Sequence, residues 1–212
     1  MIVREATAAD ARAVAQAHVA SWRAAYRGII DEDFLHNLSV DDKQSYWLQW
    51  FMRNEPSRFM RVIDDDARAV GFAVGGPARG RMPSGPARRS LAAAGAWPLA
   101  DIPPLTDATD EAAKAESATV GEVYVLYLLP EVQRRGWGTQ LMRSMARGLR
   151  QRGSQSMLLW VLQRNHAACR FYEALGGQPL YRRRTEVGRQ QLVEIGYVWD
   201  DLSTLAAPVP AR

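Results

Sequence analysis

The sequence has little cysteine and no long apolar run, and each absence excludes a class of protein. A single cysteine, Cys169, excludes an internal disulfide framework and a zinc site built from several cysteines. No segment approaches the roughly 18 consecutive apolar residues that a membrane-spanning helix needs. The first ten residues lack the basic and apolar regions of a secretory signal. These features predict a cytoplasmic protein with a reduced thiol and no membrane partner.

The chain also has only a small excess of one charge. Its 212 residues include 27 lysines and arginines against 23 aspartates and glutamates, a net charge of +4. This bias suits an anionic ligand and does not by itself indicate nucleic acid. Hydrophobic residues make up 47% of the chain, which is enough for a sizeable core. We expect a single domain over residues 1–205 and a flexible tail over 206–212.

Hydrophobic periodicity predicts an α/β chain. Strands are expected over residues 2–5, 58–63, 69–74, 122–129, 157–162, 180–187 and 191–199, the last two joined near Gly188, and helices from about 7 to 26, from 39, from 138 to 152 and from 165 to 175. Ser39 with Asp42 is a capping signal for the second helix. Two helices have an apolar face at helical spacing: the second, through Tyr46, Trp47, Trp50 and Phe51, and the third, through Leu141, Met142, Met145 and Leu149. The apolar strands over 122–129 and 157–162 are joined through a helix, which predicts that they run parallel.

Residues 76–119 show no steady period and are rich in proline, alanine and glycine. A structureless loop of this length is uncommon inside a compact domain, so the segment is expected to be an insertion. Trp97 and Leu99 are expected to pack locally within it. Its arginines, Arg79 among them, and the Arg182–Arg184 run are expected to face solvent.

A glycine-containing turn, Gln133 to Thr139, joins the central strand to the following helix. Glycines allow a close approach of backbone to ligand, and the first N–H groups of a helix have no internal partner. Together with the helix dipole they favour a phosphate, and Arg134 and Arg135 add positive charge. A plain turn with solvated arginines is the competing interpretation. No P-loop run occurs, and Leu141 stands where a dinucleotide-binding fingerprint needs its third glycine.

Two motifs carry a resemblance to a known family. Gln133–Gly138 has the pattern Gln/Arg-x-x-Gly-x-Gly/Ala after a central strand, and Asn165, Ala168 and Phe171-Tyr172 have the pattern Asn-x-x-Ala-x-x-Phe-Tyr. In this order the motifs resemble those of the GCN5-related N-acetyltransferases, strongly over about residues 120–177, more loosely over 1–75 and 178–200, and not over 76–119. The resemblance implies a mixed, mostly antiparallel central sheet that is flanked by helices and splayed between its two parallel central strands.

The same resemblance implies transfer of acetyl from acetyl-CoA to a primary amine, by direct attack in a ternary complex and without a metal. It also implies which residues contact the donor: Leu126, Tyr127 and Leu128 along the pantetheine arm, the backbone amides of Arg134, Arg135, Gly136, Trp137, Gly138 and Thr139 around the pyrophosphate, and the side chain of Asn165. The Leu128 amide would also polarise the thioester carbonyl.

The expected catalytic residues are Tyr172 and Glu122. Tyr172 is implied as the acid that protonates the departing thiolate, and a core aromatic is the alternative. Glu122 is the candidate base, and a strand-end surface carboxylate is the alternative. Trp22 and Tyr26 lie one helical turn apart and are candidates for an aromatic wall at the acceptor, although a core role competes. His18 and His36 are too isolated to indicate a metal site.

Two other classes of function stay open at the level of sequence. One is an acyl-CoA-binding regulatory protein without turnover, and the other is a basic nucleic-acid-binding module, whose binding would weaken steeply with salt. Neither the acceptor amine nor the choice between a monomer and a homodimer follows from the sequence.

Overall fold

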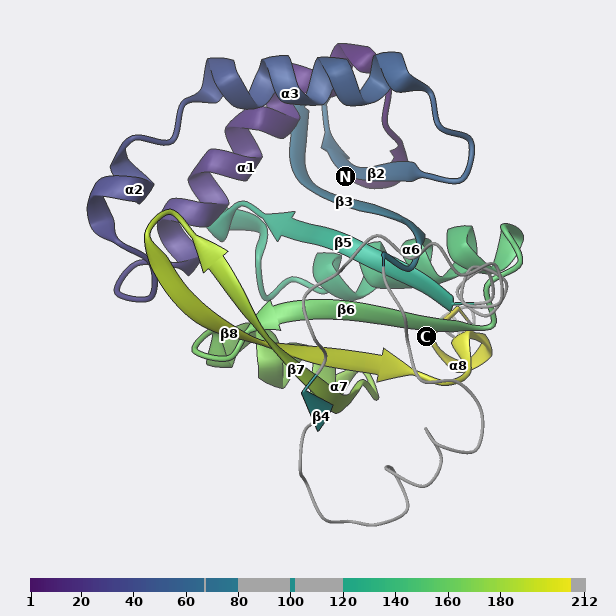
Figure 1. The fold of residues 1–212 in the computed structure, drawn as a ribbon. Coiled ribbons are helices and arrows are strands. Elements are labelled where there is room, and N and C mark those ends of the chain that lie inside the picture. The colour runs from purple at the N-terminus through teal and green to yellow at the C-terminus, as the bar shows by residue number, and fades with distance from the viewer. Residues whose placement is uncertain (67, 80–99, 102–119, 207–212) are drawn as a thin grey trace.

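The computed structural model describes residues 1–66, 68–79, 100–101 and 120–206. At its centre is one sheet, whose strands lie in the order β1-β2-β3-β5-β6-β8-β7-β4 (Figure 1). The strands are β1 (Ile2–Glu5), β2 (Phe59–Asp65), β3 (Arg68–Pro77), β4 (Ala100–Asp101), β5 (Val120–Leu128), β6 (Ser156–Leu162), β7 (Gln178–Val187) and β8 (Gln190–Trp199). β5 pairs with β6 and β4 with β7 in parallel, and the other neighbours are antiparallel. The expected mixed, mostly antiparallel sheet with two parallel central strands is confirmed.

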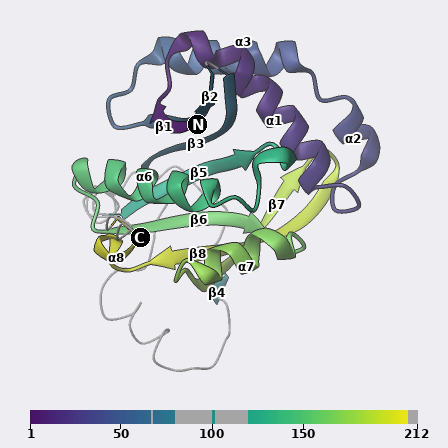
Figure 2. The ribbon, with the colours of Figure 1, turned by 180° about the vertical axis from the view of Figure 1, so that it is seen from behind.

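Helices cover both faces of this sheet. They are α1 (Ala11–Ala25), α2 (Glu32–His36), α3 (Val40–Arg53), α6 (Trp137–Gln151), α7 (His166–Ala174) and α8 (Leu202–Ala206). On one face, the Phe72 ring of β3 contacts His18 of α1 and Trp47 of α3. The opposite face carries α6 and α7, which lie in front of the strands in Figure 2. There Gly75 of β3 lies so close to α6 that a Cβ atom would be 2.7 Å from Met145 Cε.

Local signals place most of the elements. The Ser39 hydroxyl accepts a hydrogen bond from the Asp42 N–H at 3.2 Å, which caps the start of α3 as expected. After α1, the chain turns at Gly28, whose φ of +70° favours glycine. The apolar face expected for α6 is confirmed, because Leu141, Met142, Met145 and Leu149 are all buried.

Several expectations were wrong at the edges of elements. Tyr46 was expected on the apolar face of α3, but it is exposed. The residues of α3 that contact the core are Trp47, which is buried, and Trp50 and Phe51, which are partly buried. β3 continues to Pro77, and Ala100–Asp101 form a short strand beside β7, so both pieces of the expected insertion belong to the sheet. Trp97, Leu99 and most of the insertion lie outside the described residues. Ala206, expected in the tail, is buried at the end of α8, and residues 207–212 lie outside the description.

Candidate functional site

The two parallel central strands separate part of the way along their length. β5 and β6 are paired only from Val120–Ser156 to Val123–Leu159, although β5 continues to Leu128 and β6 to Leu162. The β3–β5 register shifts between the pairs Val74–Val125 and Gly75–Val123, so Tyr124 is an extra residue in β5. Such a bulge bends a strand and strengthens its twist. The expected splay is confirmed, and it leaves one edge of β5 without a strand partner after Val123.

The backbone of Leu128 points into this splay. Leu128 lies opposite Gly71 of β3, and the neighbouring Leu129 N–H donates to Val70 O at 2.9 Å. This bond makes Leu128 and Gly71 a non-hydrogen-bonded pair, so the N–H and C=O of Leu128 point away from β3. By the same alternation, the backbone groups of Leu126 point into the splay and those of Tyr127 point toward β3. The Gln133 amide donates to Leu128 O at 3.0 Å and so ties the next loop to the strand end.

The loop after β5 forms an open cradle of backbone N–H groups. Arg134 and Gly136 both have positive φ, +60° and +82°, which turns the chain sharply into α6. The first bond into that helix runs from Gln140 N–H to Gly136 O at 3.1 Å. Within the described part of the chain, the N–H groups of residues 137–139 therefore have no backbone acceptor. Arg134 and Arg135 are exposed beside them. The arrangement fits a phosphate group.

Gly138 brings this cradle against α7. A Cβ atom at Gly138 would lie 3.1 Å from Cζ of Phe171, so a side chain there would require the Phe171 ring to shift by a few tenths of an ångström. The second glycine of the first motif therefore meets the Phe-Tyr pair of the second motif in space. Asn165 caps α7, because its side-chain oxygen accepts a hydrogen bond from the Ala168 N–H at 3.2 Å.

Tyr172 of α7 lies in the core with its ring against Tyr197 and Trp199 of β8. It is 7% exposed, and burial, together with the neighbouring Tyr26 and Cys169, raises its pKa well above that of a free tyrosine. Its hydroxyl therefore stays protonated at neutral pH. This buried position fits a tyrosine that only packs in the core, and it also fits an acid, which must carry its proton before the reaction. The position of Tyr172 therefore does not distinguish the two roles.

Tyr26 and Tyr127 meet on the opposite face of the splay. Tyr26 is the C-cap of α1, and its hydroxyl interacts with that of Tyr127 of β5, so that each affects the pKa of the other. Burial raises the pKa of Tyr26 to about 12. The Trp22 ring packs edge-on against Tyr26, with centroids 5.1 Å apart. Trp22 and Tyr26 are both half-buried, so each has part of its surface in the core and part in contact with solvent.

Sequence reasoning missed the setting of His18. Its ring is 5% exposed and is stacked on Tyr127 at 5.2 Å, with Trp22 and Trp47 at 5.5 and 5.8 Å. Neither ring nitrogen has a hydrogen-bond partner among the described residues. Burial and the nearby Lys43 ammonium lower the pKa of His18 to about 3. The spacing of His18 four residues before Trp22 was the only sequence signal for this aromatic cluster.

Glu122 is buried and ion-paired, so the alternative interpretation of this residue as a surface carboxylate at a strand end is wrong. It is 1% exposed, and both of its oxygens are held by Arg79. The Arg79 N–H donates to Oε2 at 2.7 Å, and Nη2 donates to Oε1 at 2.8 Å. Arg79 was expected to face solvent, and its side chain is 47% exposed although it is ion-paired. The same expectation is wrong for Arg183, which is half-buried, pairs with Glu194 at 2.7 Å and lies over the Trp160 ring.

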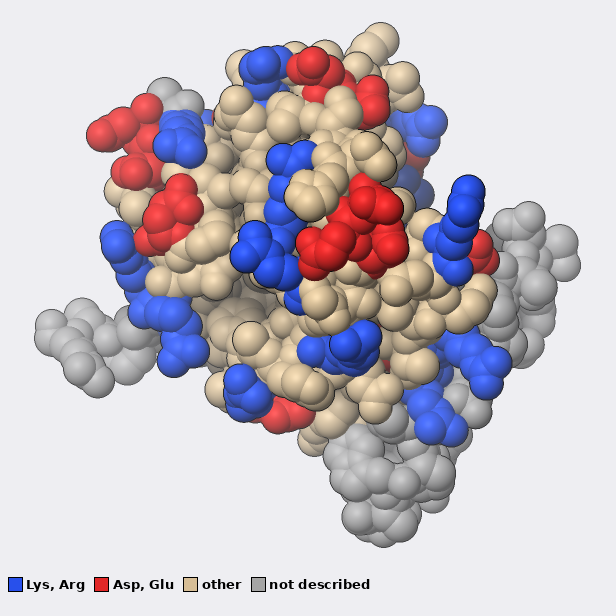
Figure 3. All heavy atoms as spheres, turned by 90° about the vertical axis from the view of Figure 1, so that its left-hand side faces the viewer, with Lys and Arg blue, Asp and Glu red and all other residues tan. Residues whose placement is uncertain are grey.

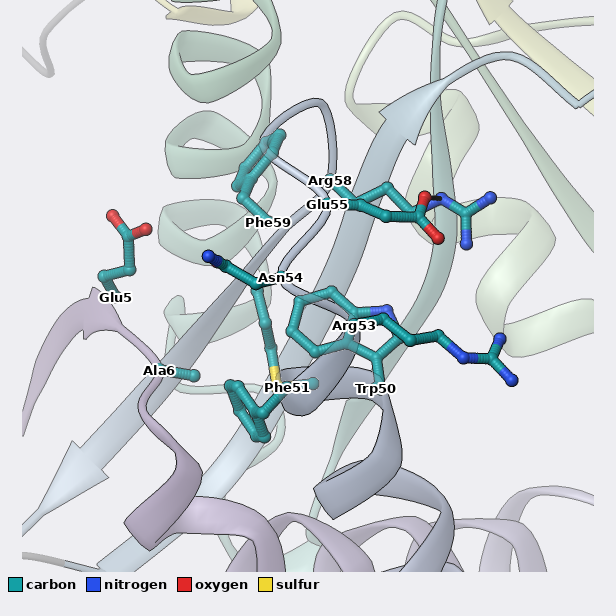
Figure 4. A pocket seen from close by; sticks show the side chains of 10 residues that line it. Glu5, Ala6, Trp50, Phe51, Arg53, Asn54, Glu55, Arg58 and Phe59 are labelled. Carbon is teal, nitrogen blue, oxygen red and sulfur yellow. Dashed lines mark ion pairs between the residues drawn. The ribbon is translucent and has the colours of Figure 1, made fainter.

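Away from the splay, a hollow lies between α3, β1 and the start of β2 (Figure 4). Trp50 and Phe51 form its apolar side, and the ion pair of Glu55 with Arg58, at 2.9 Å, lies on its rim. None of the residues expected at the cofactor or the acceptor lines this hollow. Arg58 also approaches the Tyr124 ring at 5.9 Å, so the rim adjoins the Glu122–Arg79 pair.

One face of the molecule carries surface charge of both signs, and the described residues form neither a group of metal ligands nor a helix able to cross a membrane. On the face with α2 and the end of the β7–β8 hairpin, basic and acidic side chains alternate (Figure 3). Among the described residues, no three histidine, cysteine, aspartate or glutamate side chains gather as metal ligands. No helix in the described ranges is long and apolar enough to cross a membrane.

Comparisons with known proteins agree with this geometry. A family model described as FR47-like protein matches residues 106–186. The chain is 29% identical over 204 residues to the uncharacterized N-acetyltransferase YuaI of Bacillus subtilis, covering 96% of this chain and 95% of that protein. Among solved structures, it resembles the PaiA N-acetyltransferase of Thermoplasma acidophilum in complex with coenzyme A, with a TM-score of 0.60, 15% identity and coverage of 92% and 96%. It also resembles the putative acetyltransferase YncA of Salmonella typhimurium with acetyl-CoA, with a TM-score of 0.60, 17% identity and coverage of 100% and 99%.

Proposed function

The chain belongs to the GCN5-related N-acetyltransferases, and from this premise we propose that it transfers the acetyl group of acetyl-CoA to a primary amine. One observation carries the proposal: the free edge of β5 and the open N-terminus of α6 adjoin each other. The first offers backbone groups to an extended, amide-containing arm, and the second offers N–H groups to a phosphate. A single ligand with a pantetheine arm and a pyrophosphate satisfies both.

The donor is held mainly by backbone groups. The amides of residues 134–139 bind the pyrophosphate, and Arg134 and Arg135 add positive charge at the solvent side. Leu126 and Leu128 pair with the pantetheine arm as a strand would, while Tyr127 contributes its side chain, because its backbone faces β3. The Asn165 oxygen caps α7, which leaves its amide nitrogen for the donor.

The chemical step joins the amine nitrogen to the thioester carbonyl carbon. Charge develops on the carbonyl oxygen, and the Leu126 N–H, which points into the splay four residues after Glu122, stabilises it as an oxyanion-hole donor. The Leu128 N–H lies six residues from Glu122, about 20 Å along the strand, which is too far for it to share a reaction centre with this base. The carbon–sulfur bond then breaks, and the Tyr172 hydroxyl gives its proton to the departing thiolate. A covalent enzyme intermediate is not needed, because the amine attacks directly. Glu122 is the candidate for the base that takes the proton from the amine.

We also infer the setting in which this reaction takes place. Residues 1–205 act as one domain, since the sheet runs without a break from β1 to β7. A single cysteine, half-buried on α7, suits the reducing cytoplasm. The face drawn in Figure 3 carries basic and acidic side chains side by side, so it gives no support for a nucleic-acid partner there. The enzyme acts as a monomer or a homodimer without a metal.

Replacing Tyr172 tests the proposed chemistry. In Tyr172→Phe the ring stays in the core, but the proton for the thiolate is lost, so kcat should fall about 100-fold or more while acetyl-CoA affinity is kept. Release of the CoA thiol in the presence of an amine measures the first quantity, and calorimetry the second.

Tyr197→Phe is the matched control for this experiment. Its hydroxyl donates to Glu173 at 2.7 Å and lies in the same core, so its loss perturbs packing without removing the proposed acid. We expect turnover close to that of the original chain. Equal rates for Tyr172→Phe and the original chain would contradict the role of Tyr172. Acetyl-CoA binding without turnover for any amine would favour a regulatory acyl-CoA-binding protein.

A further inference from the structure

The candidate base is covered by one specific side chain. Arg79 donates to Glu122 from its backbone N–H at 2.7 Å, from Nη2 at 2.8 Å and from Nε at 3.3 Å. The guanidinium lies over the Tyr124 ring, 4.1 Å from its centroid, which holds it in place. The Glu122 side chain is 1% exposed and the Arg79 side chain 47%. A molecule that arrives from solvent therefore meets Arg79 before it meets Glu122.

A buried carboxylate with both oxygens occupied is poorly placed to take a proton from an amine. It becomes available when Arg79 finds another acceptor for its N–H groups. A carboxylate on the incoming molecule is such an acceptor, because a guanidinium binds it with two parallel hydrogen bonds. The amino group of the same molecule then takes the place of Arg79 on Glu122. The exchange needs an amine and a carboxylate only a few bonds apart, since Arg79 and Glu122 themselves are in contact.

Charge balance favours the same class of molecule. Arg79 is paired with Glu122, and the neighbouring Arg58 is paired with Glu55, so these two pairs together carry no net charge. An α-amino acid is zwitterionic and enters without adding charge. A polyamine or an aminoglycoside would bring several positive charges next to two arginines in a partly buried place, which costs free energy.

We propose that Arg79 determines acceptor specificity by binding the carboxylate of an α-amino acid, whose amino group is then acetylated beside Glu122. This inference rests on the proposed acetyl transfer and adds the class of acceptor to it. Protein N-termini, lysine side chains and polyamines lack a carboxylate next to the amine and are poor acceptors.

Matched acceptors test the proposal. Each amino acid of a full panel is compared with its own amide, which keeps the amine and the side chain and removes the carboxylate. The panel also includes a polyamine and a lysine-containing peptide. We expect kcat/KM for the best amino acid to exceed that for its amide by about 10- to 100-fold, as for the loss of a hydrogen-bonded charged partner.

The variants show whether Arg79 causes this preference. In Arg79→Gln the ratio of amino acid to amide should fall toward one. Arg79→Lys keeps the positive charge but loses the two parallel N–H donors of the guanidinium. Its ratio of amino acid to amide should lie between those of the original chain and Arg79→Gln. Arg58→Gln removes the neighbouring arginine, which does not touch Glu122, and it should keep the ratio of the original chain.

The outcomes separate this proposal from the acetyltransferase function itself. A preference for amides or polyamines, a ratio that survives in both Arg79 variants, or acetyl-CoA binding without acetylation of any amino acid overturns the amino acid proposal. In each case the donor site still stands if acetyl-CoA titrates normally. Failure of the chain to bind acetyl-CoA overturns both.

Discussion

Burial decides the protonation states of the side chains around the splay. Tyr172 keeps its proton because its anion would be poorly solvated in the core. His18 keeps its neutral form for the same reason, since a charged ring would lie among aromatic rings with no partner for either nitrogen. Burial thus explains both why the Tyr172 hydroxyl is protonated and why the His18 ring, which stacks on Tyr127 of β5, is uncharged.

The neutral state of His18 predicts a pH-dependent stability. Its pKa is about 3 in the folded chain and about 6.5 when unfolded, so between these values the unfolded chain binds one more proton. This contribution is complete above pH 6.5 and is lost as the pH falls toward 3, by up to about 1.4 kcal/mol per pH unit. Denaturant unfolding from pH 7 to 5 should show the loss, and His18→Phe should reduce it.

His36→Phe is the control for the pH experiment, because His36 is exposed at the end of α2. Its replacement should leave the pH dependence of unfolding unchanged. If the His18→Phe and original curves have the same slope between pH 7 and 5, His18 is charged in the folded chain and the account of the aromatic cluster is wrong.

At the scale of elements, the contact of α6 with α7 links the two motifs. Gly136 needs its positive φ of +82° for the turn, and nothing lies within 4 Å of where its Cβ would be. At Gly138, by contrast, a Cβ atom would lie 3.1 Å from the Phe171 ring. The two glycines therefore serve different purposes, one conformational and one steric.

Alanine at each glycine distinguishes these purposes. Gly136→Ala should destabilise the chain by about 1 kcal/mol through backbone strain. Gly138→Ala should weaken acetyl-CoA binding, because the Phe171 ring and the start of α6 have to shift relative to each other. Adding Phe171→Leu should restore binding in the Gly138→Ala chain and should not relieve the strain in Gly136→Ala. Calorimetry and thermal unfolding measure the two effects, and a failure of Phe171→Leu to discriminate would contradict the steric role.

Sequence reasoning succeeded where the signal is local. The turn from β5 into α6, the cap of α3 and the Gly188 hairpin depend on neighbouring residues, and they were predicted. α2 and α8 span five residues each, too few for a clear period, and they were missed. The splay itself followed from the family resemblance and not from periodicity.

The candidate site was predicted only in part, because its key pairings are long-range. Arg79 and Glu122 are 43 positions apart, with a segment of irregular composition between them, so nothing local joins them. The aromatic cluster likewise unites α1, α3, β3 and β5. Its members Trp22 and Tyr26 were identified, but the buried His18 was not, since an isolated histidine carries no signal of its environment.

At the scale of the whole molecule, elements distant in sequence form one binding surface. β5 supplies an unpaired edge, α6 an open N-terminus, and α7 the buried tyrosine, while α1 closes the other face of the sheet (Figures 1 and 2). This arrangement exists only when the sheet is assembled. The account therefore requires that the folded chain binds acetyl-CoA as one ligand across all three elements.

A calorimetric titration of the chain with acetyl-CoA, with CoA and ATP as controls, tests this requirement most directly. The account predicts saturable binding of one acetyl-CoA per chain and weaker or absent binding of ATP, because ATP has phosphates for α6 but no arm for β5. Absence of binding for both acetyl-CoA and CoA would contradict it.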